Sequence, residues 1–231
     1  MHGWGSSAKS FAAVKEMMTA KGFPVYAIDL PGFGNAEMPR EAYGVDDYVR
    51  FLYEFAEREN LNQFYLLGHS LGGRIGIKFA VQYPQKLLGL ILYAAAGIKP
   101  APTHRTKLLL FSAKIGKYVF SLPILNYLKG AMTKTIYILA GTRDYYRAEA
   151  VMKETMKKII DEDLRPFLPH VKAKTLVLWG DKDKITPLTD AVIIKENIVG
   201  SVLKIIRNSG HSAHKENPEE FVDIVSAFLL Q

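Results

Sequence analysis

Short β-rich segments alternate with amphipathic segments along most of this 231-residue chain. Apolar, β-branched runs indicate strands, and apolar residues at helical spacing between them indicate helices. This alternation predicts an α/β fold in which helices flank a mostly parallel central sheet. We expect strands at Pro24–Asp29, Gln63–Gly68, Leu87–Tyr93, Thr175–Gly180 and Val202–Ile206, and helices at Phe11–Ala20, Val45–Glu59, Leu71–Tyr83 and Pro218–Leu230.

The alternation is interrupted between residues 99 and 172, where helical character is combined with scattered lysine and arginine. We therefore expect a helical cap at 99–172, inserted before the last two strands of a core formed by 1–98 and 173–231. Residues 99–174 hold 15 lysines and arginines against 6 acidic residues, in a chain of net charge +7. Solvated helix faces explain this excess. The alternative is a basic cap that associates weakly with anionic membrane surfaces and steers substrates, with an acyl channel lined by Phe111, Phe120, Leu122, Tyr145 and Tyr146.

The composition restricts the class of protein. With 48% hydrophobic and 23% charged residues, the chain is typical of a globular domain. It has no cysteine, which excludes disulfides, thiolate metal sites and cysteine nucleophiles. The apolar run Leu87–Ile98 is too short to span a bilayer, and the N-terminus does not resemble a signal peptide, so we expect a cytoplasmic protein. The positive charge comes with no nucleic-acid motif, and we expect no specific nucleic-acid partner.

Gly68, His69, Ser70, Leu71 and Gly72 form a G-x-S-x-G pattern between a predicted strand and a predicted helix. A serine on such a sharp turn projects above the sheet, and glycine two residues to either side leaves the room that the turn requires. The turn also places the Leu71 N–H at a helix N-terminus, where it can stabilise a developing oxyanion. The alternative is an ordinary glycine-rich turn, against which the flanking elements argue.

A serine nucleophile needs a histidine base and an orienting carboxylate. His211 follows the last predicted strand, and Asp181 and Asp183 follow the strand before it, which gives the order Ser, Asp, His. His214 is the alternative base. The remaining histidines considered, His69, His104 and His170, are interpreted as structural or solvated.

These motifs resemble the α/β-hydrolase superfamily over essentially the whole chain. The matching segments are HGWG at 2–5, DLPGFG at 29–34, GHSLGG at 68–73, WGDKDKITP at 179–187 and GHSAHKENPEEF at 210–221. In the family, the acid is the aspartate of a G-x-x-D-x-x-x-P loop, which favours Asp183 over Asp181. The resemblance also makes the Trp4 N–H the second oxyanion donor beside Leu71, with the Trp4 indole lining the acyl pocket.

The resemblance implies a serine hydrolase that needs neither cofactor nor metal. We expect a carboxylic ester of small or medium acyl length as the small-molecule substrate. The scaffold also hosts lipases, thioesterases, C–C bond hydrolases, haloperoxidases and acyltransferases, and a non-catalytic ligand-binding protein is the alternative class. Gly32 and Gly34 do not form a dinucleotide-binding motif, because Pro31 interrupts the turn and no third glycine follows at the required spacing.

The N-terminal region departs from the family pattern. Relatives have strands before HG, and the last of these lies between the strands that match Val25–Asp29 and Phe64–Gly68, whereas only Met1 precedes His2 here. Omitting a middle strand would leave its neighbours about 10 Å apart unless they close up. We expect either outcome to disturb Trp4, and we expect this chain to be a shortened form of a longer enzyme.

Overall fold

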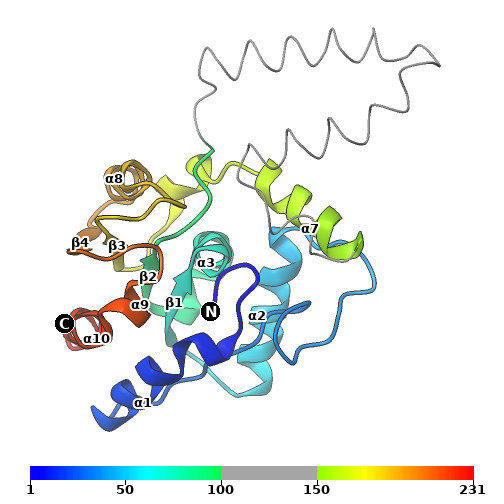
Figure 1. Ribbon diagram of the computed structural model, residues 1–231. Coiled ribbons are helices and arrows are strands. Elements are labelled where there is room, and N and C mark those ends of the chain that lie inside the picture. Colours follow the sequence, from blue (N-terminus) through cyan, green and yellow to red (C-terminus); the bar gives the residue numbers. More distant parts are fainter. Residues whose placement is uncertain (100–149) are drawn as a thin grey trace, which may run out of the picture.

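A parallel four-stranded sheet lies between two layers of helices in the computed structural model, which describes residues 1–99 and 150–231 (Figure 1). Its strands follow one another in the order β1-β2-β3-β4, and all three neighbouring pairs are parallel. The carboxyl ends of the strands therefore meet at one edge. The strands are β1 (Phe64–His69), β2 (Leu87–Tyr93), β3 (Thr175–Gly180) and β4 (Val202–Ile206).

Helices cover both faces of this sheet. Helix α1 packs against α10, and α2 packs against α3 on the opposite face (Figure 1). Strands covered on both sides are apolar throughout, and β3 accordingly has every residue buried. The helices are α1 (Ala12–Ala20), α2 (Val45–Arg58), α3 (Leu71–Gln82), α7 (Ala150–Asp161), α8 (Leu188–Asn197), α9 (Ala213–Glu216) and α10 (Pro218–Leu229), with 3-10 turns at Ala8–Phe11, Pro84–Lys86 and Arg165–His170.

The predicted α/β class is confirmed, as are four of the five predicted strands. Helix α8 was not expected from the sequence. Its apolar residues are spread around the helix: Ala191 and Ile194 face the core, whereas Val192 is exposed to solvent. Packing against β3 and β4 stabilises this helix, so the sequence periodicity alone gave no signal for it.

The strand predicted at Pro24–Asp29 is wrong. The chain between residues 21 and 30 joins no sheet, and β1 is the edge strand on this side. Residues of high β-propensity form a strand only when a neighbouring backbone is within hydrogen-bonding distance. The end of the segment is held by side chains: Asp29 accepts hydrogen bonds from Ala8 N–H (2.6 Å) and Asn35 N–H (2.9 Å).

The described part of the predicted cap begins at α7 and lies against the core. The Arg74 guanidinium donates to the carbonyl oxygens of Ile159 (2.5 Å) and Glu162 (2.6 Å). The Lys78 ammonium, almost fully buried, lies 2.7 Å from carboxylate oxygens of both Asp46 and Glu162. These contacts tie the end of α7 to α2 and α3. The aromatic and apolar side chains expected to line an acyl channel at 111–146 lie outside the described residues.

Among the helices at 1–99 and 150–231, none combines the length and the apolar composition that crossing a membrane requires.

Candidate active site

Ser70 occupies a sharp turn between β1 and α3. Its backbone has φ 51° and ψ −107°, an unfavourable conformation for a residue with a side chain. Such strain costs about 1–3 kcal/mol and is concentrated at functional sites. A Cβ on Gly68 would collide with the backbone of Gly72, and a Cβ on Gly72 would lie 2.7 Å from the Met1 carbonyl oxygen. The two glycines are therefore required by close backbone contacts.

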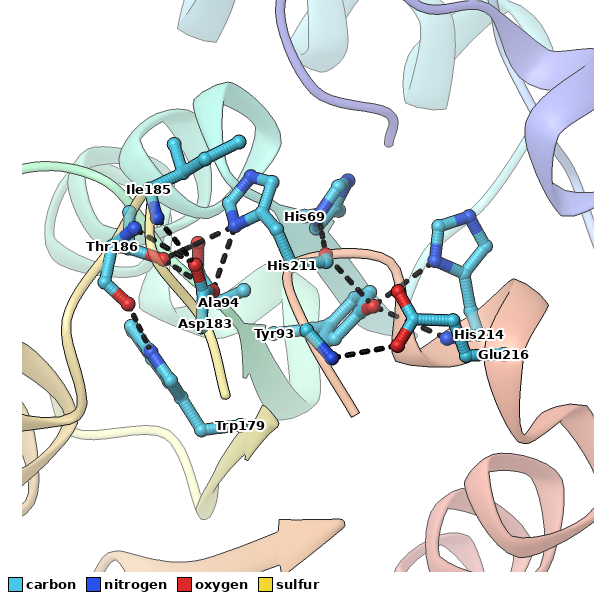
Figure 2. Close-up of polar contacts among 11 residues, drawn as sticks. His69, Tyr93, Ala94, Trp179, Asp183, Ile185, Thr186, His211, His214 and Glu216 are labelled. Carbon is cyan, nitrogen blue, oxygen red and sulfur yellow. Dashed lines mark hydrogen bonds and ion pairs between the residues drawn. The ribbon is translucent and has the colours of Figure 1, made fainter. Parts of the chain in front are cut away.

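His211 and Asp183 meet at the carboxyl edge of the sheet, in the loops that follow β4 and β3 (Figure 2). His211 Nδ1 donates to Asp183 Oδ2 at 2.8 Å, so Nε2 is the nitrogen without a proton in the neutral ring. The Asp183 side chain is fully buried and that of His211 is 14% exposed. Burial alone would raise the pKa of Asp183, but hydrogen bonds from His211, the Ile185 N–H and Thr186 lower it below its ordinary value. Asp183 is thus held as a carboxylate beside the imidazole.

Thr186 completes the surroundings of Asp183, and the sequence reasoning missed it. Its hydroxyl donates to Asp183 Oδ2 (2.8 Å), and its backbone N–H donates to Oδ1 (3.0 Å). Its carbonyl oxygen accepts from the indole N–H of Trp179 (2.9 Å), a fully buried residue of β3 (Figure 2). Thr186 lies inside the WGDKDKITP segment, three residues after Asp183, but a threonine in a loop has no sequence pattern that indicates such contacts.

The two alternatives from the sequence occupy other places. Asp181 accepts a hydrogen bond from Ser209 N–H (3.2 Å), which ties two loops together. His214 is buried, its ring stacks on Phe11 with centroids 4.4 Å apart, and its Nδ1 lies 3.0 Å from the Tyr93 hydroxyl. Burial lowers the pKa of His214 to about 4. The structure therefore pairs His211, and not His214, with Asp183.

Two side chains hold the backbone of His211. His69 Nε2 donates to the His211 carbonyl oxygen at 2.9 Å, and the Tyr93 hydroxyl lies 3.1 Å from the same oxygen (Figure 2). The His69 and Tyr93 rings stack with centroids 4.5 Å apart. Burial holds the pKa of His69 well below its ordinary value, so the ring is neutral. His69 is structural, as the sequence reasoning interpreted it, whereas Tyr93 at the end of β2 was not anticipated.

Leu71 follows Ser70 directly, and the segment that precedes Trp4 lies against the turn at Ser70. A Cβ on Gly3 would be 3.1 Å from Ser70 Cβ, so the backbone at residue 3 approaches the serine closely. His2 fixes this loop, because its Nδ1 lies 2.8 Å from the Gly3 carbonyl oxygen and its Nε2 accepts from Leu30 N–H at 3.0 Å. Neither the Trp4 N–H nor the Leu71 N–H has a hydrogen-bond partner among the described residues. The Trp4 indole meets Phe33 edge-on, with ring centroids 4.9 Å apart.

The loop that carries His211 lies beside the end of β1. The His211 ring centroid is 4.7 Å from that of His69, the residue before the serine. In the part of the chain that the structure describes, no hydrogen bond links Ser70 Oγ to His211. Catalytic hydrogen bonds of this kind are often long before substrate binds. The described residues also include no group of three metal-ligating side chains that could hold an ion.

Comparison with known proteins places this geometry in a family. The family described as serine aminopeptidase, S33, matches residues 1–218. The chain belongs to this family of α/β-hydrolases. This hydrolase is 24% identical over 248 residues to the 2-hydroxy-6-oxononadienedioate/2-hydroxy-6-oxononatrienedioate hydrolase of Escherichia coli (strain K12), covering 100% of this chain and 86% of the relative.

Solved structures show the same fold. The esterase from Exiguobacterium antarcticum superposes with a TM-score of 0.77 at 23% identity, over 100% of this α/β-hydrolase and 90% of the esterase. A bacterial membrane phospholipase A, described as a virulence factor, superposes with a TM-score of 0.72 at 24% identity, over 99% and 76% of the two chains. At these identities the likeness establishes the fold alone.

Proposed function

We propose that this α/β-hydrolase cleaves carboxylic esters through Ser70 as nucleophile, His211 as general base and Asp183 as the carboxylate that orients His211. The proposal rests on the Asp183–His211 hydrogen bond of 2.8 Å, which lies at the carboxyl edge of the sheet. Ser70, with its strained backbone, lies in the turn at the end of β1, at the same edge. A serine becomes a good nucleophile only beside such a base. The fixed Nδ1 proton leaves His211 Nε2 free to accept the serine proton.

The reaction proceeds in two halves. Ser70 Oγ attacks the ester carbonyl carbon while His211 Nε2 accepts the Oγ proton, and a tetrahedral intermediate forms. The C–O bond to the alcohol breaks as His211 returns the proton to the departing oxygen, which leaves an acyl-serine. Water then attacks this ester, again losing its proton to His211, and the carboxylic acid leaves as Ser70 recovers its proton. The negative charge on the tetrahedral oxygen is assigned to the Trp4 and Leu71 N–H groups, each worth about 3 kcal/mol in sites of this type.

The substrate is proposed to have a small or medium acyl chain, and residues 99–172 are proposed to form a cap over the site. The basic residues of this segment support weak association with anionic surfaces, since exposed lysine and arginine are attracted to anionic lipid. At physiological salt the field of these exposed charges is screened over about 8 Å, so this surface does not prevent neutral substrates from reaching the site.

The test is labelling with a fluorophosphonate, followed by turnover of p-nitrophenyl esters from acetate to decanoate. We expect stoichiometric label on Ser70, and we expect Ser70→Ala to lose both labelling and turnover. Label on another serine would refute the assignment of the nucleophile. One slow acylation without turnover would instead support a non-catalytic ligand-binding protein. Turnover confined to a 2-hydroxy-6-oxo-dienedioate would assign the activity in the name of the Escherichia coli relative.

A further inference from the structure

Hydrogen-bond donors meet both oxygens of the Asp183 carboxylate. Oδ1 accepts from the backbone N–H groups of Ile185 (2.8 Å) and Thr186 (3.0 Å). Oδ2 accepts from His211 Nδ1 (2.8 Å) and from the Thr186 hydroxyl (2.8 Å), as Figure 2 shows. The backbone donors fix the position of the carboxylate. The two side-chain donors share one oxygen, so each of them affects the hydrogen bond that the other makes.

The single hydrogen of the Thr186 hydroxyl has a choice of partners. Asp183 Oδ2 lies 2.8 Å from Thr186 Oγ1, and the Ala94 carbonyl oxygen lies 3.2 Å away. The carboxylate is both nearer and charged, and a hydrogen bond to an ionised acceptor is roughly twice as strong as a neutral one. Since His211 Nδ1 is 3.3 Å from Oγ1 but 2.8 Å from Oδ2, its proton is also directed to the carboxylate. Both donors therefore compete for Oδ2.

Thr186 is held firmly in this place. Its carbonyl oxygen accepts from the indole N–H of Trp179 (2.9 Å), and both side chains are buried. The Asp183 side chain is fully buried as well. Water therefore does not replace the hydroxyl at Oδ2 when the threonine is substituted, and the loss of a buried hydrogen bond is felt in full.

We propose that the Thr186 hydroxyl is a positioning group that limits how strongly Asp183 holds the protonated form of His211, a role that rests on the proposed function of this site. A donor at Oδ2 stabilises the negative charge, so the same oxygen attracts the imidazolium less. His211 then stays unprotonated, and able to accept the Ser70 proton, down to a lower pH. Once protonated, it returns the proton to the departing alcohol more readily, because a less stabilised imidazolium is a stronger acid.

Other titratable and charged side chains face the Asp183–His211 pair from the elements packed around it. They are His69 at the end of β1, Tyr93 at the end of β2, Asp190 on α8 with Arg165 near it, and His214 on α9. Burial lowers the pKa of both histidines and raises the pKa of the tyrosine, so all three are uncharged at neutral pH. Burial raises the pKa of Asp190 to about 6, so the experiment must separate its titration from the effect of Thr186.

The experiment compares Thr186→Val, which keeps the shape and removes the hydroxyl, with Thr186→Ser, which keeps the hydroxyl. The acid limb of kcat/KM for p-nitrophenyl acetate, measured from about pH 5 to about pH 9, reports protonation of the base in the free enzyme. We expect its midpoint to rise by about half a pH unit in Thr186→Val, because Asp183 then holds the imidazolium more strongly. Thr186→Ser should restore the midpoint. Thr186→Ala, which also lacks the hydroxyl, should give the same rise.

Thr155→Val is the matched control. Thr155 is a fully buried threonine of α7, and its Oγ1 accepts from the Tyr43 N–H at 3.0 Å. This substitution should lower the free energy of unfolding by about 1–3 kcal/mol, because a buried N–H loses its partner, and should leave the midpoint of the acid limb unchanged. A threonine that acts only through stability would give the Thr155→Val result at position 186.

A second measurement does not depend on hydrolysis. In the Ser70→Ala protein with isotope-labelled histidine, NMR follows the His211 ring as pH changes, and the signal missing from His211→Gln identifies it. Adding Thr186→Val should raise the titration midpoint by about half a pH unit, with or without Asp190→Asn. A protein without ester turnover would refute the proposed function, and the NMR titration then tests the hydroxyl by itself. An unchanged or lower midpoint in either measurement, or a rise that Asp190→Asn removes, would overturn the proposal.

Discussion

Replacing Tyr93 by phenylalanine removes one hydroxyl that serves three groups. The hydroxyl lies 3.1 Å from the His211 carbonyl oxygen, 3.2 Å from the His214 N–H and 3.0 Å from His214 Nδ1. The phenyl ring keeps the stacking on His69, so the change creates no large cavity. The substitution therefore isolates the contribution of the hydrogen bonds.

The stability cost follows from which groups lose their partner. The His211 carbonyl keeps its hydrogen bond from His69, so its loss is small. The buried His214 N–H is left without a partner, which costs about 1–3 kcal/mol. We expect the free energy of unfolding to fall by about 2–3 kcal/mol, a tolerable fraction of the roughly 5–15 kcal/mol typical of a domain. Urea denaturation measures it.

The catalytic effect is expected in kcat. With one of its two backbone contacts gone, the loop carrying His211 can shift, and sub-ångström misplacement of a base costs about tenfold. KM should stay unchanged because Tyr93 is not placed in the substrate pocket. Tyr48→Phe is the matched control: within the described ranges its hydroxyl donates only to the Pro31 carbonyl oxygen (3.1 Å), so we expect about 1 kcal/mol of lost stability and unchanged kcat. Equal effects of the two variants, or an unchanged kcat in Tyr93→Phe, would refute the positioning role.

Three further predictions concern the base, a perturbed carboxyl and the basic segment. His211→Gln should lose nearly all turnover and His214→Gln should keep most of it; the reverse pattern would move the base to His214. Burial raises the pKa of half-buried Asp190 to about 6, so the free energy of unfolding falls as pH rises from about 4 to 6. In urea denaturation, Asp190→Asn should therefore be up to about 1 kcal/mol more stable than the unsubstituted protein at pH 7 but not at pH 4. The same difference at both pH values would contradict burial as the cause. If residues 99–174 steer anionic substrates, kcat/KM for an anionic ester should fall as salt rises while that of a neutral ester of equal acyl length stays constant, and flat responses for both would identify these residues as solvated faces.

The sequence by itself determined the sharp turn at Ser70. Gly68 and Gly72 flank Ser70 within five residues, and a Cβ on Gly68 would collide with the backbone of Gly72, so local spacing was enough to predict the turn. The collision of a Cβ on Gly72 with Met1 is a long-range contact that local spacing does not reveal. The same is true of α3, whose apolar spacing is a short-range property. Strands β1 to β4 were predicted because each is a short, mostly apolar run bounded by turn residues, although β4 carries Lys204 in its middle.

Only the tertiary structure revealed the roles of residues that contact distant parts of the sequence. Position in the loop left both Asp181 and Asp183 open, and only the family resemblance favoured Asp183. The structure places Asp183, 28 residues from His211 in the sequence, 2.8 Å from its ring. Tyr93 and Thr186 gave no sequence signal because their roles consist of contacts to other loops. The segment Pro24–Asp29 has strand-like residues without a strand, since a β-strand exists only through a neighbour's backbone, whereas a helix satisfies its own hydrogen bonds.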